Sequence, residues 1–162
     1  MQAVVRAVAL RLRAAGIPWR LAGSAALLVR GLPVRPGDID VEVAAADAVA
    51  AARTLGLPAP ARQAGGGWSS DRTVGQVAGV GIDLSGGLVV TGPGGTLRAM
   101  DAPVEEHGGI PLLPIGESLA RALVAESGPR RLKAIAALPD DPALRSRAIT
   151  YAESRAAASA AR

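Results

Sequence analysis

Hydrophobic residues in the first third of the chain recur with two different periods. Val4, Val8 and Leu12 share one helical stripe, which predicts an amphipathic helix within residues 1–15 that ends at Gly16. The elements predicted next are a strand at 19–22, a helix at 25–30, a strand at 38–43 and a helix at about 47–55. Helical and strand periods therefore alternate along this part of the chain. We expect Asp47 to cap the last of these helices.

The remainder of the chain predicts strands first and helices afterwards. Residues 57–67 are rich in proline and glycine and predict a loop. The predicted strands are 72–78, 80–85 and 88–91, and the predicted helices are about 117–126, 130–138 and 142–161. We find no internal repeat and no long linker. The pattern predicts one α+β domain over residues 1–162, with a small mixed sheet in a core at about 1–100 and a helical tail at about 112–162.

Two aspartates occupy alternate positions in the predicted strand 38–43. Residues i and i+2 of a strand project from the same face, so Asp38 and Asp40 stand side by side while Ile39 and Val41 point into a core. Like charges at that distance repel each other, and a divalent cation neutralises them. The pattern therefore predicts a metal site.

Composition narrows the choice of metal. The chain has no cysteine and one histidine, so it cannot build a thiolate or imidazole zinc cage. Carboxylate ligands suit magnesium or manganese, which complete their coordination with water and phosphate oxygens. The lack of cysteine favours a reducing cytoplasm, and no apolar run is long enough to span a membrane, so we expect a cytoplasmic protein without a membrane partner.

A third carboxylate and a glycine-serine pair extend this site. Asp83 lies in the predicted strand 80–85, and it converges with Asp38 and Asp40 if the two strands are neighbours; otherwise it is a surface residue. Gly23 and Ser24 follow a strand and open a helix, where backbone N–H groups can bind a phosphate. The alternative is that Ser24 only caps the helix.

These motifs resemble the nucleotidyltransferase superfamily that includes DNA polymerase β. The resemblance rests on residues 21–28 and 31–43, which hold Gly-Ser and Asp-Ile-Asp, and on the later Asp83. The chain looks especially like small bacterial members, and it also looks like the short lincosamide and aminoglycoside nucleotidyltransferases and toxin-associated relatives. The motifs cover about half of the chain, from residue 21 to residue 84.

The resemblance implies a role for each matching residue. Gly23 and Ser24 would hold the β- and γ-phosphates of a nucleotide, Asp38 and Asp40 would bind metal, and Asp83 would bind metal or deprotonate the acceptor. The implied reaction is the transfer of a nucleoside monophosphate from an NTP, with ATP expected, to a hydroxyl acceptor. That acceptor is a small molecule, a tRNA or a protein, and the cofactor is Mg²⁺ or Mn²⁺.

Basic residues are the remaining candidates. Arg35 and Arg30 are expected to pair with the triphosphate, and the alternative for each is a surface arginine. Relatives often carry a lysine in the first C-terminal helix and a lysine-aspartate element in the next, whereas residues 128–134 here lack the aspartate, so Arg131 or Lys133 would have to bind phosphate instead.

Two alternative functions stay open at this stage. The altered segment 128–134 favours a degenerate relative that binds nucleotide or a partner protein, as in a toxin-antitoxin pair. A net charge of +4 allows nucleic acid as a partner, but the scarcity of aromatic residues disfavours an RNA-binding module.

Overall fold

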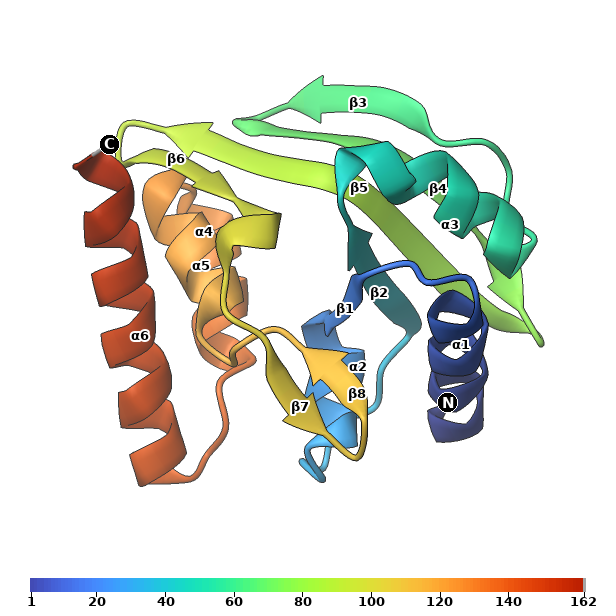
Figure 1. The fold of residues 1–162 in the computed structure, drawn as a ribbon. Coiled ribbons are helices and arrows are strands. Elements are labelled where there is room, and N and C mark those ends of the chain that lie inside the picture. The colour runs from blue at the N-terminus through green and yellow to red at the C-terminus, as the bar shows by residue number, and fades with distance from the viewer. Residues whose placement is uncertain (162) are drawn as a thin grey trace.

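One mixed sheet forms the centre of the computed structural model, which describes residues 1–161 (Figure 1). Its strands are β1 (Trp19–Ala22), β2 (Asp38–Val43), β3 (Ala61–Gly65), β4 (Trp68–Val77), β5 (Val80–Gly92), β6 (Gly95–Arg98), β7 (Glu105–His107) and β8 (Ile110–Leu112). They follow the order β3-β4-β5-β2-β1-β8-β7, and β6 pairs with the far end of β5. The sheet is mixed because β2 runs parallel to β5 and β1 runs parallel to β8, while the other pairs are antiparallel.

Helices lie in two groups on either side of this sheet (Figure 1). The helices are α1 (Gln2–Ala14), α2 (Gly23–Val29), α3 (Ala48–Leu55), α4 (Glu117–Val124), α5 (Gly128–Ala136) and α6 (Pro142–Ala160), with single helical turns at Ala45–Asp47 and Ala99–Asp101. The first group contains α1 and α3, which contact each other, and the second contains α4, α5 and α6. The short helix α2 contacts β1, β2 and α1. Within residues 1–161, no helix combines the length and apolar character that crossing a membrane requires.

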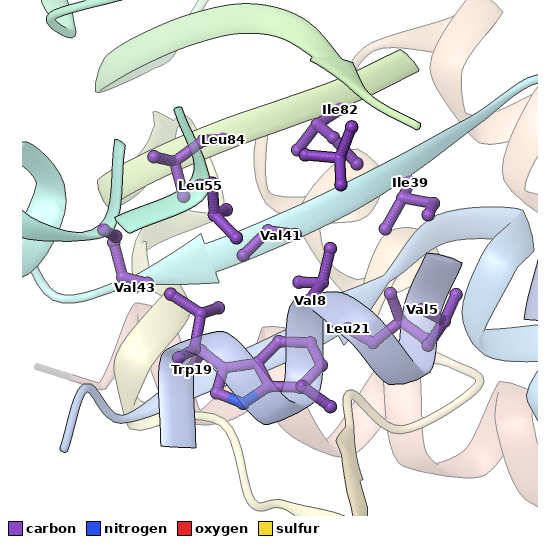
Figure 2. Close-up of a cluster of buried hydrophobic side chains, with 14 of the residues drawn as sticks. Val5, Val8, Trp19, Leu21, Ile39, Val41, Val43, Leu55, Ile82 and Leu84 are labelled. Atoms are coloured by element: carbon purple, nitrogen blue, oxygen red, sulfur yellow. The ribbon is translucent and has the colours of Figure 1, made fainter. Parts of the chain in front are cut away.

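The first hydrophobic core lies between the sheet and the helices α1 and α3. Ile39, Val41 and Val43 of β2 are fully buried in it, as the alternating pattern predicts, together with Ile82 and Leu84 of β5. Figure 2 shows these side chains converging on residues from the first helix and from β1. Burial of this apolar face fixes the rotation of β2, so its other face carries Asp38 and Asp40 away from the core.

A second core holds the helical tail. It joins Leu119 and Val124 of α4 to Ala148 and Ala152 of α6, and it also includes Val90 near the end of β5. The tail is therefore packed on the far half of the long strand β5. The polar faces of β2 and of the first half of β5 therefore lie between the two cores.

The structure confirms the predicted α+β class and its mixed sheet followed by helices, and it corrects several boundaries. The predicted strand 88–91 is wrong as a separate element, because β5 runs unbroken from Val80 to Gly92. The predicted loop 57–67 contains β3, whose residues are all exposed and so show no apolar alternation. The short strands β6, β7 and β8 were not predicted.

The expected side-chain cap at Asp47 is also wrong. The backbone of Asp47 is already helical, because the single turn at Ala45–Asp47 leads directly into α3. Its carboxylate accepts no capping hydrogen bond. A residue with helical backbone angles cannot adopt the extended geometry of an N-cap.

The middle of β5 passes close beneath α3, and glycine makes that approach possible. A Cβ built at Gly86 would overlap the Cβ of Ala48, whereas a Cβ at Gly65 in β3 would meet nothing within 4 Å. We predict that Gly86→Ala lowers the free energy of unfolding by roughly 1–3 kcal/mol, the usual cost of overpacking. Urea denaturation measures the loss, and Gly65→Ala is the control. Equal losses in both variants would contradict the close packing.

Candidate functional site

Parallel pairing of β2 with β5 brings the three predicted carboxylates to one side of the sheet. Asp40 is the direct register partner of Asp83, and Asp38 is opposite Gly81. All three aspartates line one pocket of about 840 Å³, a size typical of small-molecule sites. The expectation that Asp83 converges with Asp38 and Asp40 on neighbouring strands is met, and Asp83 is half-buried in the pocket wall.

The backbone of Gly23 lies directly against Asp40. Gly23 has a φ of 60°, and a Cβ at this position would overlap Oδ2 of Asp40. Glycine is therefore required on two counts, by the left-handed backbone and by the close approach of the carboxylate. Ser24 is the next residue and lines the same pocket.

Ser24 does not cap α2. The N-cap of this helix is Ala22, and no side chain accepts a capping hydrogen bond. The alternative interpretation of Ser24 as an ordinary N-cap is therefore wrong. Its hydroxyl lies at the pocket without a capping role, which leaves the predicted phosphate contact as the remaining hypothesis.

The surroundings of Asp40 in the pocket shift its pKa. The pKa of Asp40 is raised from 3.8 to about 6, mainly by burial and in addition by the neighbouring charges of Asp38 and Asp83. Lys133 opposes this shift through its positive charge. An acid with a raised pKa in a pocket is typical of functional sites, where a bound cation relieves the repulsion.

Asp83 carries an ion pair that the sequence did not predict. Arg72 of β4 donates from Nε to Oδ1 of Asp83 at 2.8 Å and from Nη2 to Oδ2 at 2.5 Å. In the antiparallel pairing of β4 with β5, Arg72 is opposite Ser85, so the bond to Asp83 is a diagonal contact on one face. The pair is partly exposed, with 41% of the Arg72 side chain and 19% of the Asp83 side chain accessible.

The carboxylates differ in how well they fit a metal ion. Asp38 and Asp40 offer oxygen donors, the ligand type that magnesium and manganese prefer. The two carboxylates also repel each other, and a bound cation would relieve that repulsion. Among residues 1–161, no group of three or more Asp, Glu or His side chains could hold one metal ion, and Asp83 is bound by Arg72. The pair Asp38 and Asp40 therefore fits the predicted cofactor, and Asp83 as a further ligand stays a prediction.

The predicted basic residues are divided between the pocket and the surface. Lys133 of α5 and Arg30 line the pocket, but Arg30 also donates to Glu105 at 2.5 Å and to the carbonyl oxygen of Leu113 at 2.6 Å. Arg35 and Arg131 are exposed and are not among the pocket-lining residues. Of the four, Lys133 is best placed to meet a phosphate, and roles for the others remain predictions.

Arg130 is a basic pocket residue that the motif analysis missed. Its guanidinium carbon lies 4.5 Å from the centre of the Trp68 ring, and it donates to the carbonyl oxygen of Gly66 at 3.2 Å. Both contacts connect α5 to the turn between β3 and β4. A guanidinium over an indole ring is held by cation-π attraction, so this contact joins α5 to the β3–β4 hairpin within the pocket lining.

A buried charge network, whose members Glu42, Glu117 and Arg121 line the pocket, was also missed. Arg121 of α4 binds Glu42 through two hydrogen bonds of 2.5 and 3.0 Å and binds Glu117 at 3.1 Å. Tyr151 of α6 donates to Glu117 at 2.6 Å, and Arg155 lies 3.5 Å from the same carboxylate. Burial alone would lower the pKa of Arg121, but the two glutamates outweigh it and raise the pKa.

This network joins the helical tail to the strand that carries the aspartates. Glu42 follows Asp38 and Asp40 at the same two-residue spacing and on the same face of β2. That spacing is the signal from which Glu42 could have been found, whereas its partner Arg121 is 79 residues away and has no local signal. The ion pair therefore fixes α4 and α6 relative to β2.

The fold is similar to a crystal structure from Thermotoga maritima, of a protein that is itself a proposed nucleotidyltransferase. The TM-score is 0.62 with 19% sequence identity, over 69% of this chain and 76% of that chain. No family model and no curated protein matches the sequence. At this identity the similarity is one of fold, so the chain has a nucleotidyltransferase-like fold with three aspartates at one pocket.

The raised pKa of Asp40 gives a pH dependence of stability. Because the folded pKa of about 6 lies above the value of 3.8 for a free aspartate, the native state holds the proton more strongly, and stability falls as the pH rises from about 4 to about 6. We predict that metal-free Asp40→Asn is more stable than the wild type at pH 7, by roughly 1–3 kcal/mol. Denaturation between pH 4 and pH 8 measures this, with exposed Asp140→Asn as the control. An unchanged slope in Asp40→Asn would refute the assignment.

Loss of one member of the buried network is expected to be costly. We predict that Glu42→Gln lowers the free energy of unfolding by about 3 kcal/mol or more, because Arg121 then keeps a buried charge with fewer partners. The control is Glu105→Gln, which removes a carboxylate that is 53% exposed from Arg30 and is expected to cost less than about 1 kcal/mol. Similar losses in the two variants would show that the network adds no special stability.

Proposed function

We propose that the protein transfers a nucleoside monophosphate from an NTP to a hydroxyl acceptor with the help of Mg²⁺ or Mn²⁺. The observation that carries this proposal is the joint placement of Asp38, Asp40 and Asp83 beside Gly23 and Ser24 at one pocket. The nucleotidyltransferase-like fold supports it.

The residues on the β2 side of the pocket would hold the nucleotide. Asp38 and Asp40 would bind the cation, which when bound neutralises negative charge on the phosphates and orients them. The backbone of Gly23 and the hydroxyl of Ser24 would contact the terminal phosphates. Lys133 would add a positive charge from α5, on the opposite side of the pocket from the sheet, in place of the lysine found in relatives.

Asp83 would act as the general base. The acceptor hydroxyl gives its proton to an Asp83 oxygen while its own oxygen bonds to the α-phosphorus of the NTP, the bond between the α- and β-phosphates breaks, and pyrophosphate leaves with the electron pair. Arg72 occupies one lone pair on each Asp83 oxygen, and a carboxylate has about four in all. The ion pair therefore orients Asp83 and leaves room for the hydroxyl.

The finer parts of the proposal concern the substrates. ATP is the expected donor, and small molecules, tRNA and proteins are the acceptor classes that the resemblance implies. Membership of the lincosamide, aminoglycoside or toxin-associated groups is likewise proposed from the resemblance. The absence of cysteine is consistent with a function in the reducing cytoplasm.

A transfer assay tests the proposal. Incubation with α-labelled NTPs and Mg²⁺ should move label to an acceptor, and Asp83→Asn should reduce the rate by a factor of about 10² or more because it removes the base but keeps the shape. Asp38→Asn should abolish nucleotide-dependent thermal stabilisation in the presence of Mg²⁺. The control variant is Asp140→Asn, which changes an exposed aspartate outside the pocket.

Two outcomes would contradict parts of this account. Undiminished transfer in Asp83→Asn would remove that residue from the mechanism. Equal stabilisation of wild type and Asp38→Asn by nucleotide and Mg²⁺ would show that Asp38 does not hold the cation.

A second candidate function is nucleotide or partner binding without catalysis. The bidentate hold of Arg72 on Asp83 favours it, because the same carboxylate would have to serve as the base. The segment 128–134 without an aspartate favours it too. Metal-dependent nucleotide binding without transfer to any acceptor in a broad panel would support this candidate over the enzyme.

A further inference from the structure

The strand order arranges the pocket from one end to the other. Gly23 and Ser24 follow β1, Asp38 and Asp40 lie on β2, and Asp83 lies on β5. Beyond Asp83 come β4 and β3, which form a hairpin on the far side from the predicted phosphate contacts. If the proposed function holds, the acceptor must approach Asp83 from this hairpin end, because the nucleotide fills the other.

The hairpin end of the pocket is positively charged. Its polar and aromatic lining residues are Gln63, Trp68, Ser69, Ser70 and Arg72 from β3 and β4, with Arg130 from α5. Asp83 is the pocket-lining carboxylate bound to this hairpin, and Arg72 already neutralises it. The other acids that line the pocket lie on β2 and α4, and of these Glu42 and Glu117 are bound by Arg121. Asp71 is not among the pocket-lining residues and lies 3.7 Å from Arg62. The side chains that the hairpin and α5 contribute to the lining therefore suit an anion better than a polycation.

Arg72 has donors left for a ligand. Its Nε and one N–H of Nη2 bind Asp83, while Nη1 has one long contact of 3.4 Å to Oε1 of Gln63. An arginine carries five N–H donors in a planar fork, so this side chain can hold Asp83 and a second oxyanion together. A phosphate group bound to Nη1 would hold the compound that carries it directly beside Asp83, the proposed base.

We propose that the acceptor is a phosphate-bearing hydroxyl compound, and that Arg72 recognises its phosphate while orienting Asp83 toward its hydroxyl. This inference rests on the proposed function and names the chemical class of its acceptor. It disfavours the polyamine acceptors of aminoglycoside-modifying relatives, because their ammonium groups would face Arg72 and Arg130. The phosphate can come from a small sugar phosphate or from the backbone of an RNA with a free 3′ hydroxyl.

Calorimetric titration tests this directly. The protein is saturated with Mg²⁺ and a non-hydrolysable ATP analogue, and ribose 5-phosphate, ribose, a 2-deoxystreptamine aminoglycoside and a short RNA are titrated separately. We expect ribose 5-phosphate or the RNA to bind at least about tenfold more tightly than ribose, the strength of charge-assisted hydrogen bonds. The tighter of the two identifies the source of the phosphate. Tighter binding of the aminoglycoside would overturn the proposal.

Variants of Arg72 test whether this side chain causes the preference for a phosphorylated ligand. Arg72→Gln should remove the preference for the phosphorylated ligand, and Arg72→Lys should keep part of it because it retains a point charge without the fork. The matched control is Arg62→Gln, which removes a positive charge from the same hairpin at a residue that does not line the pocket. A preference that survives in Arg72→Gln would overturn the proposal. The wild-type comparison of ligands stands even if a variant fails to fold.

Failure of this inference can be told apart from failure of the proposed function. Label transfer to uncharged or cationic acceptors would leave the transferase in place and refute the anionic acceptor. The same titrations without the ATP analogue test the opposite case, in which the anion subsite exists but the protein is not a transferase. Binding of ribose 5-phosphate that requires Arg72, in a protein that binds no NTP, would leave the anion subsite in place and refute the transferase.

Discussion

Parallel pairing of β2 with β5 is the constraint on which the rest of the structure depends. It sets Asp40 opposite Asp83, and the burial of Ile39, Val41 and Ile82 on the other face prevents either strand from rotating. A shift of one residue would move the carboxylates into the hydrophobic core and the apolar side chains into the pocket. Hydrophobic burial on one face therefore holds together like charges on the other.

The cost of that arrangement is visible in the raised pKa of Asp40. Two ion pairs offset the repulsion between the carboxylates on this face of the sheet. Arg72 neutralises Asp83 from the neighbouring strand, and Arg121 binds Glu42, the next acid along the same face of β2. Asp38 and Asp40 have no such arginine among the ion pairs described for residues 1–161, so they remain the acids that a cation would stabilise most.

The buried network also joins the helical tail to the sheet. Glu117 connects α4 to α6 through Tyr151 and Arg155, while Arg121 connects α4 to β2. The helix α5 packs against α4 and brings Lys133 and Arg130 to the pocket. The positions of these two basic residues therefore depend on buried charges that line the same pocket.

Patterns that act over a few residues could be predicted from the sequence. The period of two in β2 gave the pairing of Asp38 with Asp40, and the succession of helical and strand periods gave the α+β class. Contacts between distant residues could not be predicted. Arg72 was recognised only as part of a strand, because its bond to Asp83 depends on the register of β4, and Arg121 has its partner 79 residues earlier. The edge strand β3 could not be predicted, because both its faces are exposed and its sequence has no apolar alternation.

The most direct measurement is a crystal structure of the protein with Mn²⁺ and a non-hydrolysable ATP analogue, with anomalous diffraction to locate the metal. The account predicts a manganese peak within about 2.0–2.6 Å of carboxylate oxygens from Asp38 and Asp40, bridged to the phosphates, with Ser24 beside the terminal phosphates. An analogue bound elsewhere, or manganese absent from Asp38 and Asp40 at saturating concentration, would contradict the claim that this pocket is a nucleotidyl-transfer site.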